Sequence, residues 1–308
     1  MTGPASTSDG VPPDTSARAR EGAPVSASQS PSAAAAAAAA GDFPLGGDLR
    51  VNRLGFGAMR LVFGGRARDP EAGVAVLRRA VELGVNHIDT AGFYGFGDVW
   101  AHETIRRALS PYPDDLVIAT KVGPLLEGGV LPTGQAAPEQ LRALVEEDLR
   151  RLGLDRLDLV YLRVAEPDGE SVGARFEALA ELRRKGLIRH LGLSNVGASQ
   201  LAEAQSIAPV AAVQNRFHVQ YRGDSGLLAQ CEQQGIAYVP YFPLGGGREP
   251  IQSARLASAV ARHQATVAQV ALAWLLALSP VTLAIPGTSS LDHLTENVAA
   301  AGLRVAVD

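Results

Sequence analysis

Three ionisable residues stand at or just beyond the ends of short apolar segments. Asp89 ends the segment 85–89, Tyr94 follows in a stretch that contains glycine, and Lys121 ends the segment 116–121. A phenol is a weak acid, a nearby cation lowers the pKa of such a group, and a carboxylate can hold the cation in place. We therefore expect an Asp–Lys–Tyr cluster in which Tyr94 works as a general acid near neutral pH.

A regular alternation of apolar and amphipathic segments surrounds these residues. Strands are expected at residues 53–58, 85–89, 116–121, 157–163, 188–194, 210–214, 236–240 and 282–286. Helices are expected at residues 69–84, 101–109, 138–153, 175–186, 198–207, 224–235, 253–263, 266–277 and 291–300. Short apolar strands separated by helices are typical of a parallel sheet that the helices cover.

Eight strand–helix units within residues 43–308 predict a single-domain α/β fold, a closed (β/α)8 TIM barrel. The alternative is an open doubly wound sheet, which normally carries a G-x-G-x-x-G stretch after its first strand. Here the first strand leads into GAMRLVFGG, and the stretch GFG at 95–97 has Trp100 where the third glycine is needed. The sequence therefore favours the barrel.

Local signals support individual elements. Asp69 is a suitable N-cap for the first helix, with Pro70 at the first helical position. Ahead of the first strand, the stretch 43–53 has Gly46 and Gly47 as a candidate turn. It predicts a hairpin that closes the floor of the barrel.

Polar residues gather at the expected ends of the strands, whose bodies are mainly Val, Ile, Leu and Ala. In a barrel of this type the chemistry takes place at the carboxyl ends of the strands. Besides Asp89 and Lys121, the polar groups there are Arg163, Ser194-Asn195, Gln214-Asn215, Tyr241 and the stretch GTSS at 287–290. We expect these groups to form one site.

The composition excludes several classes of function. A formal net charge of −4 gives no basic surface for nucleic acid or an anionic membrane. No apolar stretch is long and uniform enough to span a bilayer, and the histidines show no metal-ligand spacing, so no metal site is expected. The single cysteine, Cys231, allows no intrachain disulfide, which indicates a cytoplasmic protein.

Residues 1–42 differ from the rest of the chain. They are rich in Pro, Ser, Ala and Gly, contain no aromatic residue and include the run Ala33–Ala40. Such a segment cannot bury enough apolar surface to offset its ordering entropy, which predicts a disordered tail. The alternative is an export signal, but the alanine run is weakly apolar and no compact basic segment precedes it.

The motifs at the expected strand ends resemble those of the aldo-keto reductases. They are HIDTAGFYG, LVIATKVG, GLSNV, AAVQN, YVPYFPLG and LAIPGTSSLDHLTENVAAAG, in this order within residues 43–308. The resemblance implies an NADP(H)-dependent oxidoreductase that reduces a small aldehyde or ketone to an alcohol by hydride transfer. It also implies that Tyr94 is the general acid, tuned by Lys121, and that Asp89 fixes Lys121.

Arg163 departs from the family pattern, which commonly has a histidine at this position. Arginine remains charged and only donates hydrogen bonds, so it can polarise a carbonyl oxygen but cannot relay a proton. The alternative is a structural salt bridge from Arg163 to Glu166 or Asp168. Phe63, Phe93 and Trp100 are candidate apolar walls of the substrate pocket.

The resemblance also implies the residues that bind the cofactor. Ser194, Asn195 and Gln214 are expected to hold the nicotinamide carboxamide, and Tyr241 is expected to stack on the ring. The other expected contacts are Gly57, Met59 and Arg60 in the first loop, Pro243, Leu244 and Gly245 at the pyrophosphate, Gly287, Thr288, Ser289, Ser290 and His293 at the 2′-phosphate, and Glu296 and Asn297 at the adenine. NADP(H) is expected rather than NAD(H), although Gly287 and His293 stand where many relatives have a lysine and an arginine.

Two further alternatives accompany this interpretation. Ser289 and Asp292 also suit a capping box at the start of the last helix. A non-catalytic or sensory NADP(H)-binding barrel is the alternative function. The presence of Asp89, Tyr94 and Lys121 favours the enzyme, because a pure binder needs no tuned phenol. The sequence does not specify the substrate or the oligomeric state.

Overall fold

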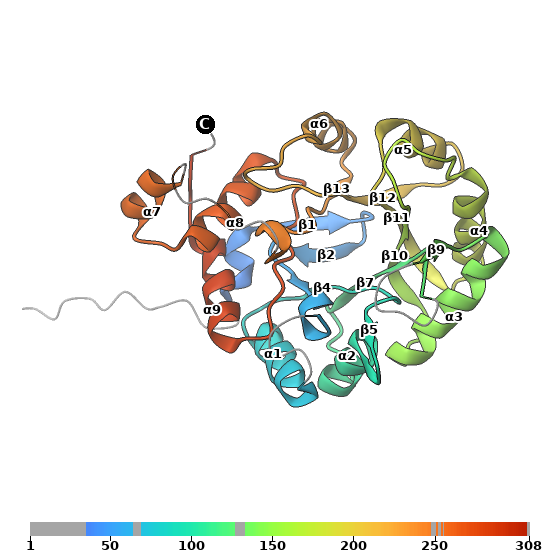
Figure 1. Cartoon of the computed structure of the whole chain (residues 1–308), viewed down its shortest axis with the longest axis horizontal. Coiled ribbons are helices and arrows are strands. Elements are labelled where there is room, and N and C mark those ends of the chain that lie inside the picture. The colour runs from blue at the N-terminus through green and yellow to red at the C-terminus, as the bar shows by residue number, and fades with distance from the viewer. Residues whose placement is uncertain are drawn as a thin grey trace, which may run out of the picture. The chain divides into compact units, whose positions relative to one another are not determined.

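Parallel strands inside a ring of helices form a (β/α)8 barrel, as the alternation in the sequence predicts (Figure 1). The structure is a computed structural model that describes residues 35–63, 69–126, 133–247, 251, 254 and 256–306. The strands of its largest sheet lie in the spatial order β13-β12-β11-β10-β7-β4-β3. Their bounds are β3 (Phe56–Gly57), β4 (His87–Asp89), β7 (Val117–Val122), β10 (Leu157–Arg163), β11 (Ile188–Ser194), β12 (Val210–Gln214) and β13 (Ala237–Tyr238).

Isolated bridges, rather than a continuous strand, occupy the position of the eighth strand predicted at 282–286. Tyr238 pairs with Thr282 and Leu54 pairs with Ala284, both in the parallel sense. Two backbone hydrogen bonds of 2.8 Å join Ala284 to the segment just before β3. The predicted strand is therefore confirmed in position but is shorter than expected, and these bridges close the barrel between β13 and β3.

The described part of the chain contains nine α-helices, which match the predicted series. Their bounds are α1 (Pro70–Glu82), α2 (Ala101–Leu109), α3 (Leu141–Leu152), α4 (Gly173–Arg184), α5 (Ala198–Gln205), α6 (Ser225–Gln234), α7 (Ala257–His263), α8 (Val267–Leu278) and α9 (Leu291–Ala299). Helix α1 begins as predicted, because the Asp69 side chain accepts a hydrogen bond from the backbone nitrogen of Glu71. In the described ranges no helix has both the length and the apolar character needed to cross a membrane.

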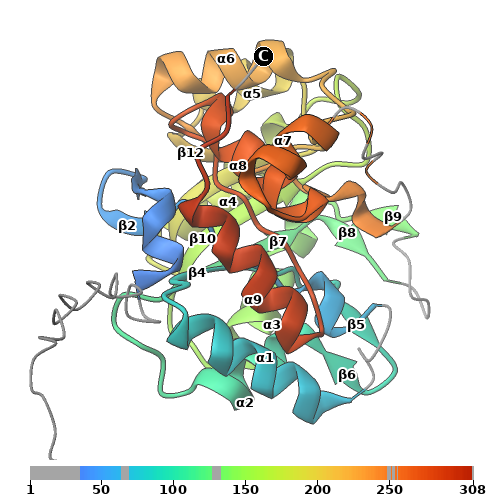
Figure 2. The same cartoon turned by 90° about the vertical axis from the view of Figure 1, so that its left-hand side faces the viewer.

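In the described ranges, three small antiparallel sheets accompany the barrel. Their strands are β1 (Asp42–Leu45) with β2 (Leu49–Asn52), β5 (Gly95–Phe96) with β6 (Val99–Trp100), and β8 (Pro124–Leu125) with β9 (Gly134–Gln135). Figure 2 shows β2 at one end of the barrel and the other two pairs toward the opposite end. The first pair is the hairpin predicted at 43–53.

The β1–β2 hairpin covers the amino-terminal end of the barrel strands. Gly46 and Gly47 form its turn with φ angles of 63° and 91°, in the left-handed region that glycine adopts readily. Asp48 at the turn forms an ion pair with Arg189, and its Oδ1 atom lies 2.6 Å from His190 Nε2, near the start of β11. The predicted floor is therefore confirmed, and the carboxyl ends of the strands lie on the other side.

The described chain begins before the predicted boundary of the tail. Ala37–Ala40 form a short 3-10 helix, η2. The Ala37 side chain is fully buried, and the backbone nitrogen of Ala37 donates to the carbonyl oxygen of Leu83 at 3.0 Å. Small side chains allow this close approach, so the prediction of a disordered tail as far as residue 42 is wrong for the end of the alanine run. Residues 1–34 lie outside the described part of the chain.

Candidate active site

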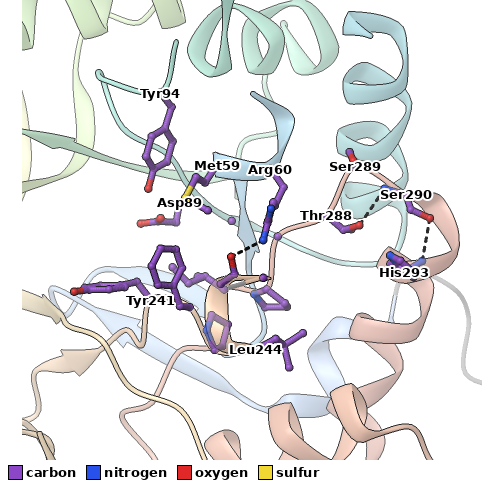
Figure 3. Close-up of a pocket in the computed structure, with 18 of the residues that line it drawn as sticks. Met59, Arg60, Asp89, Tyr94, Tyr241, Leu244, Thr288, Ser289, Ser290 and His293 are labelled. Carbon is purple, nitrogen blue, oxygen red and sulfur yellow. Dashed lines mark hydrogen bonds between the residues drawn. The ribbon is translucent and has the colours of Figure 1, made fainter. Parts of the chain in front are cut away.

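A cavity of about 670 Å³ lies at the carboxyl ends of the strands (Figure 3). This volume is within the usual range for sites that bind small molecules or cofactors. Loops after β3, β4, β12 and β13 and the segment before α9 form its wall. The lining residues are Gly57, Met59, Arg60, Asp89, Tyr94, Gln214, Tyr241, Phe242, Pro243, Leu244, Gly246, Gly247, Ile285, Pro286, Gly287, Thr288, Ser289, Ser290 and His293.

Lys121 is almost completely buried, and Asp89 balances its charge. The Lys121 Nζ atom lies 2.6 Å from Asp89 Oδ1 and donates to the carbonyl oxygen of Thr90 at 2.7 Å. Gln214 Nε2 donates to Asp89 Oδ2 at 2.6 Å. Since a buried charge without a partner is costly, these contacts fix the positions of both Lys121 and Asp89.

Tyr94 lies in the turn after β4, and its hydroxyl points into the cavity toward Asp89 (Figure 3). The Lys121 Nζ atom lies 5.2 Å from the centroid of the Tyr94 ring. Phe63 and Phe93 pack edge-on against this ring, with centroids 6.2 Å and 5.2 Å away. The structure therefore brings the three predicted members of the cluster together at one end of the cavity.

Arg163 ends β10 and lies beside the cavity rather than on its wall. Its Nη1 atom donates to Ser194 Oγ at 3.0 Å, and its Cζ atom lies 5.0 Å from the centroid of the Tyr241 ring. Within the described residues it forms no ion pair with Glu166 or Asp168, so the structural salt bridge considered from the sequence is wrong. The partners of the guanidinium here are a neutral hydroxyl and an aromatic ring.

Ser194 and Asn195 also lie behind the wall of the cavity. Asn195 has a φ of 64°, which few residues other than glycine adopt. Its Nδ2 atom donates to the carbonyl oxygens of Val164 and Ala165, and its Oδ1 accepts a hydrogen bond from the Tyr241 hydroxyl at 3.0 Å. In this structure Asn195 therefore orients Tyr241.

Most residues predicted to bind the cofactor line the cavity, namely Gly57, Met59, Arg60, Gln214, Tyr241, Pro243, Leu244, Gly287, Thr288, Ser289, Ser290 and His293. The predicted residues outside the lining are Ser194, Asn195, Gly245, Glu296 and Asn297. Asn297 is buried in the packing of α9, and the Glu296 carbonyl oxygen accepts a hydrogen bond from Gln269 Nε2 of α8. The backbone of Glu296 therefore takes part in the contact between α8 and α9.

Glycines let the first and last loops of the barrel meet at the cavity. A Cβ atom at Gly287 would lie 2.3 Å from the Gly57 carbonyl oxygen, and a Cβ atom at Gly57 would lie 2.7 Å from the Ile285 carbonyl oxygen. Only glycine allows an approach this close. Arg60 of the first loop donates from Nη2 to the Gly246 carbonyl oxygen at 2.6 Å (Figure 3). The seam that closes the barrel is therefore also part of the cavity wall.

Helix α9 begins at a different serine from the one predicted. Ser290 is its N-cap, since the Ser290 Oγ atom accepts a hydrogen bond from the backbone nitrogen of His293. Thr288 Oγ1 accepts a hydrogen bond from the backbone nitrogen of Ser290 at 3.0 Å. The predicted capping box of Ser289 and Asp292 is wrong. The hydroxyls still line the cavity, and the amino end of a helix favours anions.

Five lining residues are not among those named in the prediction: Phe242, Gly246, Gly247, Ile285 and Pro286. Phe242 has a φ of 55°, and its ring packs edge-on against Tyr241 at 5.3 Å. No sequence signal identifies a phenylalanine in this conformation. Conversely, Phe93 and Trp100, which were expected as walls of the substrate pocket, line a separate cavity of about 190 Å³.

A second buried polar cluster lies behind the strand end that carries the lysine. Thr120 Oγ1 donates to Asp148 Oδ2 at 2.8 Å and lies 3.1 Å from His102 Nε2. Burial raises the pKa of Asp148 to about 8 and lowers the pKa of His102 to about 3. Asp148 also packs against Gly92, where a Cβ atom would lie 2.4 Å from its Oδ1. The cluster thus ties α2 and α3 to β7 and to the turn after β4.

The interior of the barrel near Asp89 contains polar groups that stay neutral. His87 is fully buried, and neither ring nitrogen has a hydrogen-bond partner among the described residues. Burial lowers the pKa of His87 to about 4, and burial together with the Asp89 carboxylate raises the pKa of Tyr161 well above its usual range. Charge in this region is therefore concentrated in the Asp89–Lys121 pair. Nowhere in the described ranges do three or more His, Cys, Asp or Glu side chains form a group able to hold a metal ion.

Comparisons with known proteins agree with this fold. The model of the aldo/keto reductase family matches residues 53–306. The chain belongs to this family of oxidoreductases. It is 47% identical to pyridoxine 4-dehydrogenase of Escherichia coli (strain K12), over 84% of this chain and 92% of that protein.

Solved structures give the same result. An aldo-keto reductase from Klebsiella pneumoniae in complex with NADPH is 27% identical, with a TM-score of 0.71 over 86% of this chain and 90% of that one. An aldo/keto reductase from the same organism in complex with NADP and acetate is also 27% identical, with a TM-score of 0.72 over 86% of this chain and 91% of that one. Both share the barrel and carry a nicotinamide cofactor.

Proposed function

We propose that the protein is an NADP(H)-dependent oxidoreductase that interconverts aldehydes or ketones and alcohols. One observation carries this proposal: the buried Lys121–Asp89 ion pair lies beneath Tyr94 at the end of a cavity large enough for a cofactor. A barrel that only bound the cofactor would have no use for a buried ammonium held against a phenol ring.

The residues divide the chemistry as follows. The bound nicotinamide supplies or accepts the hydride. Tyr94 donates its hydroxyl proton to the carbonyl oxygen as negative charge develops there. The Lys121 ammonium, 5.2 Å from the centre of the Tyr94 ring, stabilises the phenolate that remains, and Asp89 keeps Lys121 in position. Arg163 polarises the carbonyl oxygen but relays no proton.

The cavity wall supports a phosphate-bearing dinucleotide. Arg60 is the permanently charged cation among the described lining residues, and we assign it to the phosphates together with the hydroxyls before α9. Gln214 Oε1 is buried and has no hydrogen-bond partner in the described ranges, so it can accept from the carboxamide of the nicotinamide. Tyr241 offers a ring face at the same end. The NADPH and NADP complexes of the two structural relatives support NADP(H) rather than NAD(H).

We propose pyridoxal and pyridoxine as the substrate pair. The support is the 47% identity to pyridoxine 4-dehydrogenase, which extends over most of both chains. Reduction of the pyridoxal aldehyde gives the alcohol pyridoxine, which is the conversion that the proposed roles of Tyr94 and Lys121 allow. We also propose that the barrel from residue 43 onward is the catalytic domain and that it works in the cytoplasm.

The test is NADPH oxidation by the full chain with pyridoxal and a panel of small aldehydes, diketones and aromatic ketones. Tyr94→Phe should lower kcat by about 10²–10⁴-fold, because general acid catalysis is typically worth this much. Its affinity for NADPH should stay close to that of the wild type. Tyr221→Phe removes a hydroxyl from an exposed tyrosine and serves as the matched control.

Two outcomes contradict the proposal. A fully active Tyr94→Phe variant would remove the phenol from the mechanism. Tight NADPH binding without turnover of any carbonyl compound would favour the sensory barrel instead.

A further inference from the structure

Arg163 lies beside one end of the cavity, behind Tyr241 of its wall. Figure 3 shows Tyr94, Asp89 and Tyr241 together at one end, whereas the segment before α9 lies at the other. The Arg163 Cζ atom is 5.0 Å from the centroid of the Tyr241 ring. The guanidinium is therefore placed beside the end at which a carbonyl group must meet Tyr94, and away from the hydroxyls proposed to bind phosphate.

The pairing of the strands gives the same position. Arg163 of β10 is the register partner of Ser194 of β11, and Ser194 is the partner of Gln214 of β12. Gln214 in turn donates to Asp89 at 2.6 Å. Arg163 therefore lies at the same level of the sheet as Ser194 and Gln214, and Gln214 contacts the Asp89–Lys121 ion pair. Arg163 itself stands two strands away from Gln214.

Arg163 differs from the other cations of the site in its partners. Lys121 is neutralised by Asp89, and Arg60 is engaged by a backbone carbonyl on the cavity wall. The described partners of Arg163 are the Ser194 hydroxyl and the face of Tyr241, neither of which carries a charge. A permanent positive charge is thus held at the reacting end without a carboxylate from the described part of the protein.

The geometry of a guanidinium restricts which anion would use this charge best. Its planar fork presents parallel N–H groups that suit two neighbouring oxygens. A carbonyl oxygen and an ionised hydroxyl on the adjacent ring carbon form such a pair, and the carbonyl oxygen keeps a second lone pair for Tyr94. An oxyanion in this position donates electron density toward the carbonyl carbon and weakens it as a hydride acceptor. A guanidinium bound to both oxygens opposes that effect.

We propose that Arg163 determines specificity for aromatic aldehydes that carry an ionised hydroxyl beside the aldehyde group. This proposal rests on the proposed carbonyl reduction, and pyridoxal, with a ring hydroxyl next to its aldehyde, belongs to the class. The aromatic rings of Tyr94, Phe63 and Tyr241 at this end suit a flat substrate ring. A 2-oxo acid also presents two neighbouring oxygens, and it is included in the test as the competing class.

The experiment compares kcat/KM of the full chain with NADPH for 2-hydroxybenzaldehyde, 4-hydroxybenzaldehyde, 2-methoxybenzaldehyde and pyruvate. The kcat/KM for the 2-hydroxy isomer should exceed that for both other aldehydes by about 10- to 100-fold. This ratio corresponds to one additional hydrogen bond to a charged group. The preference should appear as the substrate hydroxyl ionises with rising pH. Arg163→Met should abolish the preference, and Arg163→Lys, which keeps the charge without the fork, should retain part of it.

A second measurement does not depend on turnover. Binding of 2-hydroxybenzaldehyde to the wild type should shift its absorption spectrum toward the ionised form, and Arg163→Met should not produce this shift. Equal preference for the isomers in wild type and Arg163→Met, or a preference for pyruvate, would overturn the proposal. If no aldehyde is reduced at all, the proposed function fails, while the spectral titration still tests Arg163.

Discussion

The buried carboxyl group of Asp148 makes a contribution to folding stability that changes with pH. Burial raises the pKa of Asp148 from 3.8 to about 8, and the hydrogen bond from Thr120 offsets only part of this effect. For an acid whose pKa is raised by folding, the cost is absent below the unfolded pKa. It grows as pH rises toward the folded pKa and is constant above it. The wild type should therefore lose stability between about pH 4 and pH 8.

The size of this loss follows from the shift in pKa. A shift of one pKa unit corresponds to about 1.4 kcal/mol. Roughly three units of the Asp148 shift lie above pH 5, so their effect on stability falls within the interval from pH 5 to pH 9. Allowing for relaxation of the buried site, we expect about 2–4 kcal/mol of unfolding free energy to be lost over this interval. Asp148→Asn keeps the shape of the side chain but cannot ionise, so this part of the pH dependence should disappear.

The assay is urea unfolding of wild type and Asp148→Asn near pH 5, 7 and 9. Asp148→Asn should be the more stable protein near pH 9, and the difference should shrink toward pH 5. The pKa of His102, lowered to about 3, acts in the opposite direction, because it costs stability as pH falls below about 6.5 in both proteins. The exposed Asp114→Asn serves as the control and should follow the wild type. Parallel profiles of wild type and Asp148→Asn from pH 5 to 9 would refute the reasoning.

Three other substitutions or treatments test the remaining features. Lys121→Met should cost about 3–5 kcal/mol of unfolding free energy, because Asp89 is left buried without its partner. The double variant Lys121→Met/Asp89→Asn should recover much of this loss. Strictly additive losses of the two single variants would contradict the coupling. Gly287→Ala forces a Cβ atom to 2.3 Å from the Gly57 carbonyl oxygen, so NADPH binding, followed by fluorescence, should weaken and stability should fall by about 1–3 kcal/mol. Unchanged binding and stability would rule out the close approach. Cys231 is buried and its pKa is raised to about 12, so iodoacetamide should label it only as the protein unfolds, and rapid labelling of the native protein would contradict this burial.

The sequence predicted those parts of the fold that depend on local patterns. Asp69 and Pro70 mark the start of α1 because capping depends on residues close together in the chain. The closure of the barrel at Ala284 was predicted as a full strand, but the structure has isolated bridges there. The length of a strand depends on partners far away in the sequence, which a local pattern does not contain.

The same distinction applies to the site. The meeting of Asp89, Lys121 and Tyr94 could be predicted because strand ends in a parallel barrel converge at one edge. The cluster of Thr120, Asp148 and His102 was not predicted. Its members come from a strand and two helices and share no motif, so only the packing of α2 and α3 on β7 brings them together.

The seam between the first and last units has a consequence for the apoprotein. Isolated bridges at Leu54 and Tyr238 hold the ring of strands together there, and the cavity wall runs across the same join through Gly57 and Gly287. A dinucleotide bound at the proposed site would contact both sides of this seam and would link the first and last units of the barrel. Because such a ligand binds only the folded chain, it should raise the melting temperature, and the gain in unfolding free energy should grow with the logarithm of its concentration relative to Kd. We expect the amide hydrogens of Gly55 and Ala284, which take part in the hydrogen bonds across this seam, to exchange more slowly when the dinucleotide is bound.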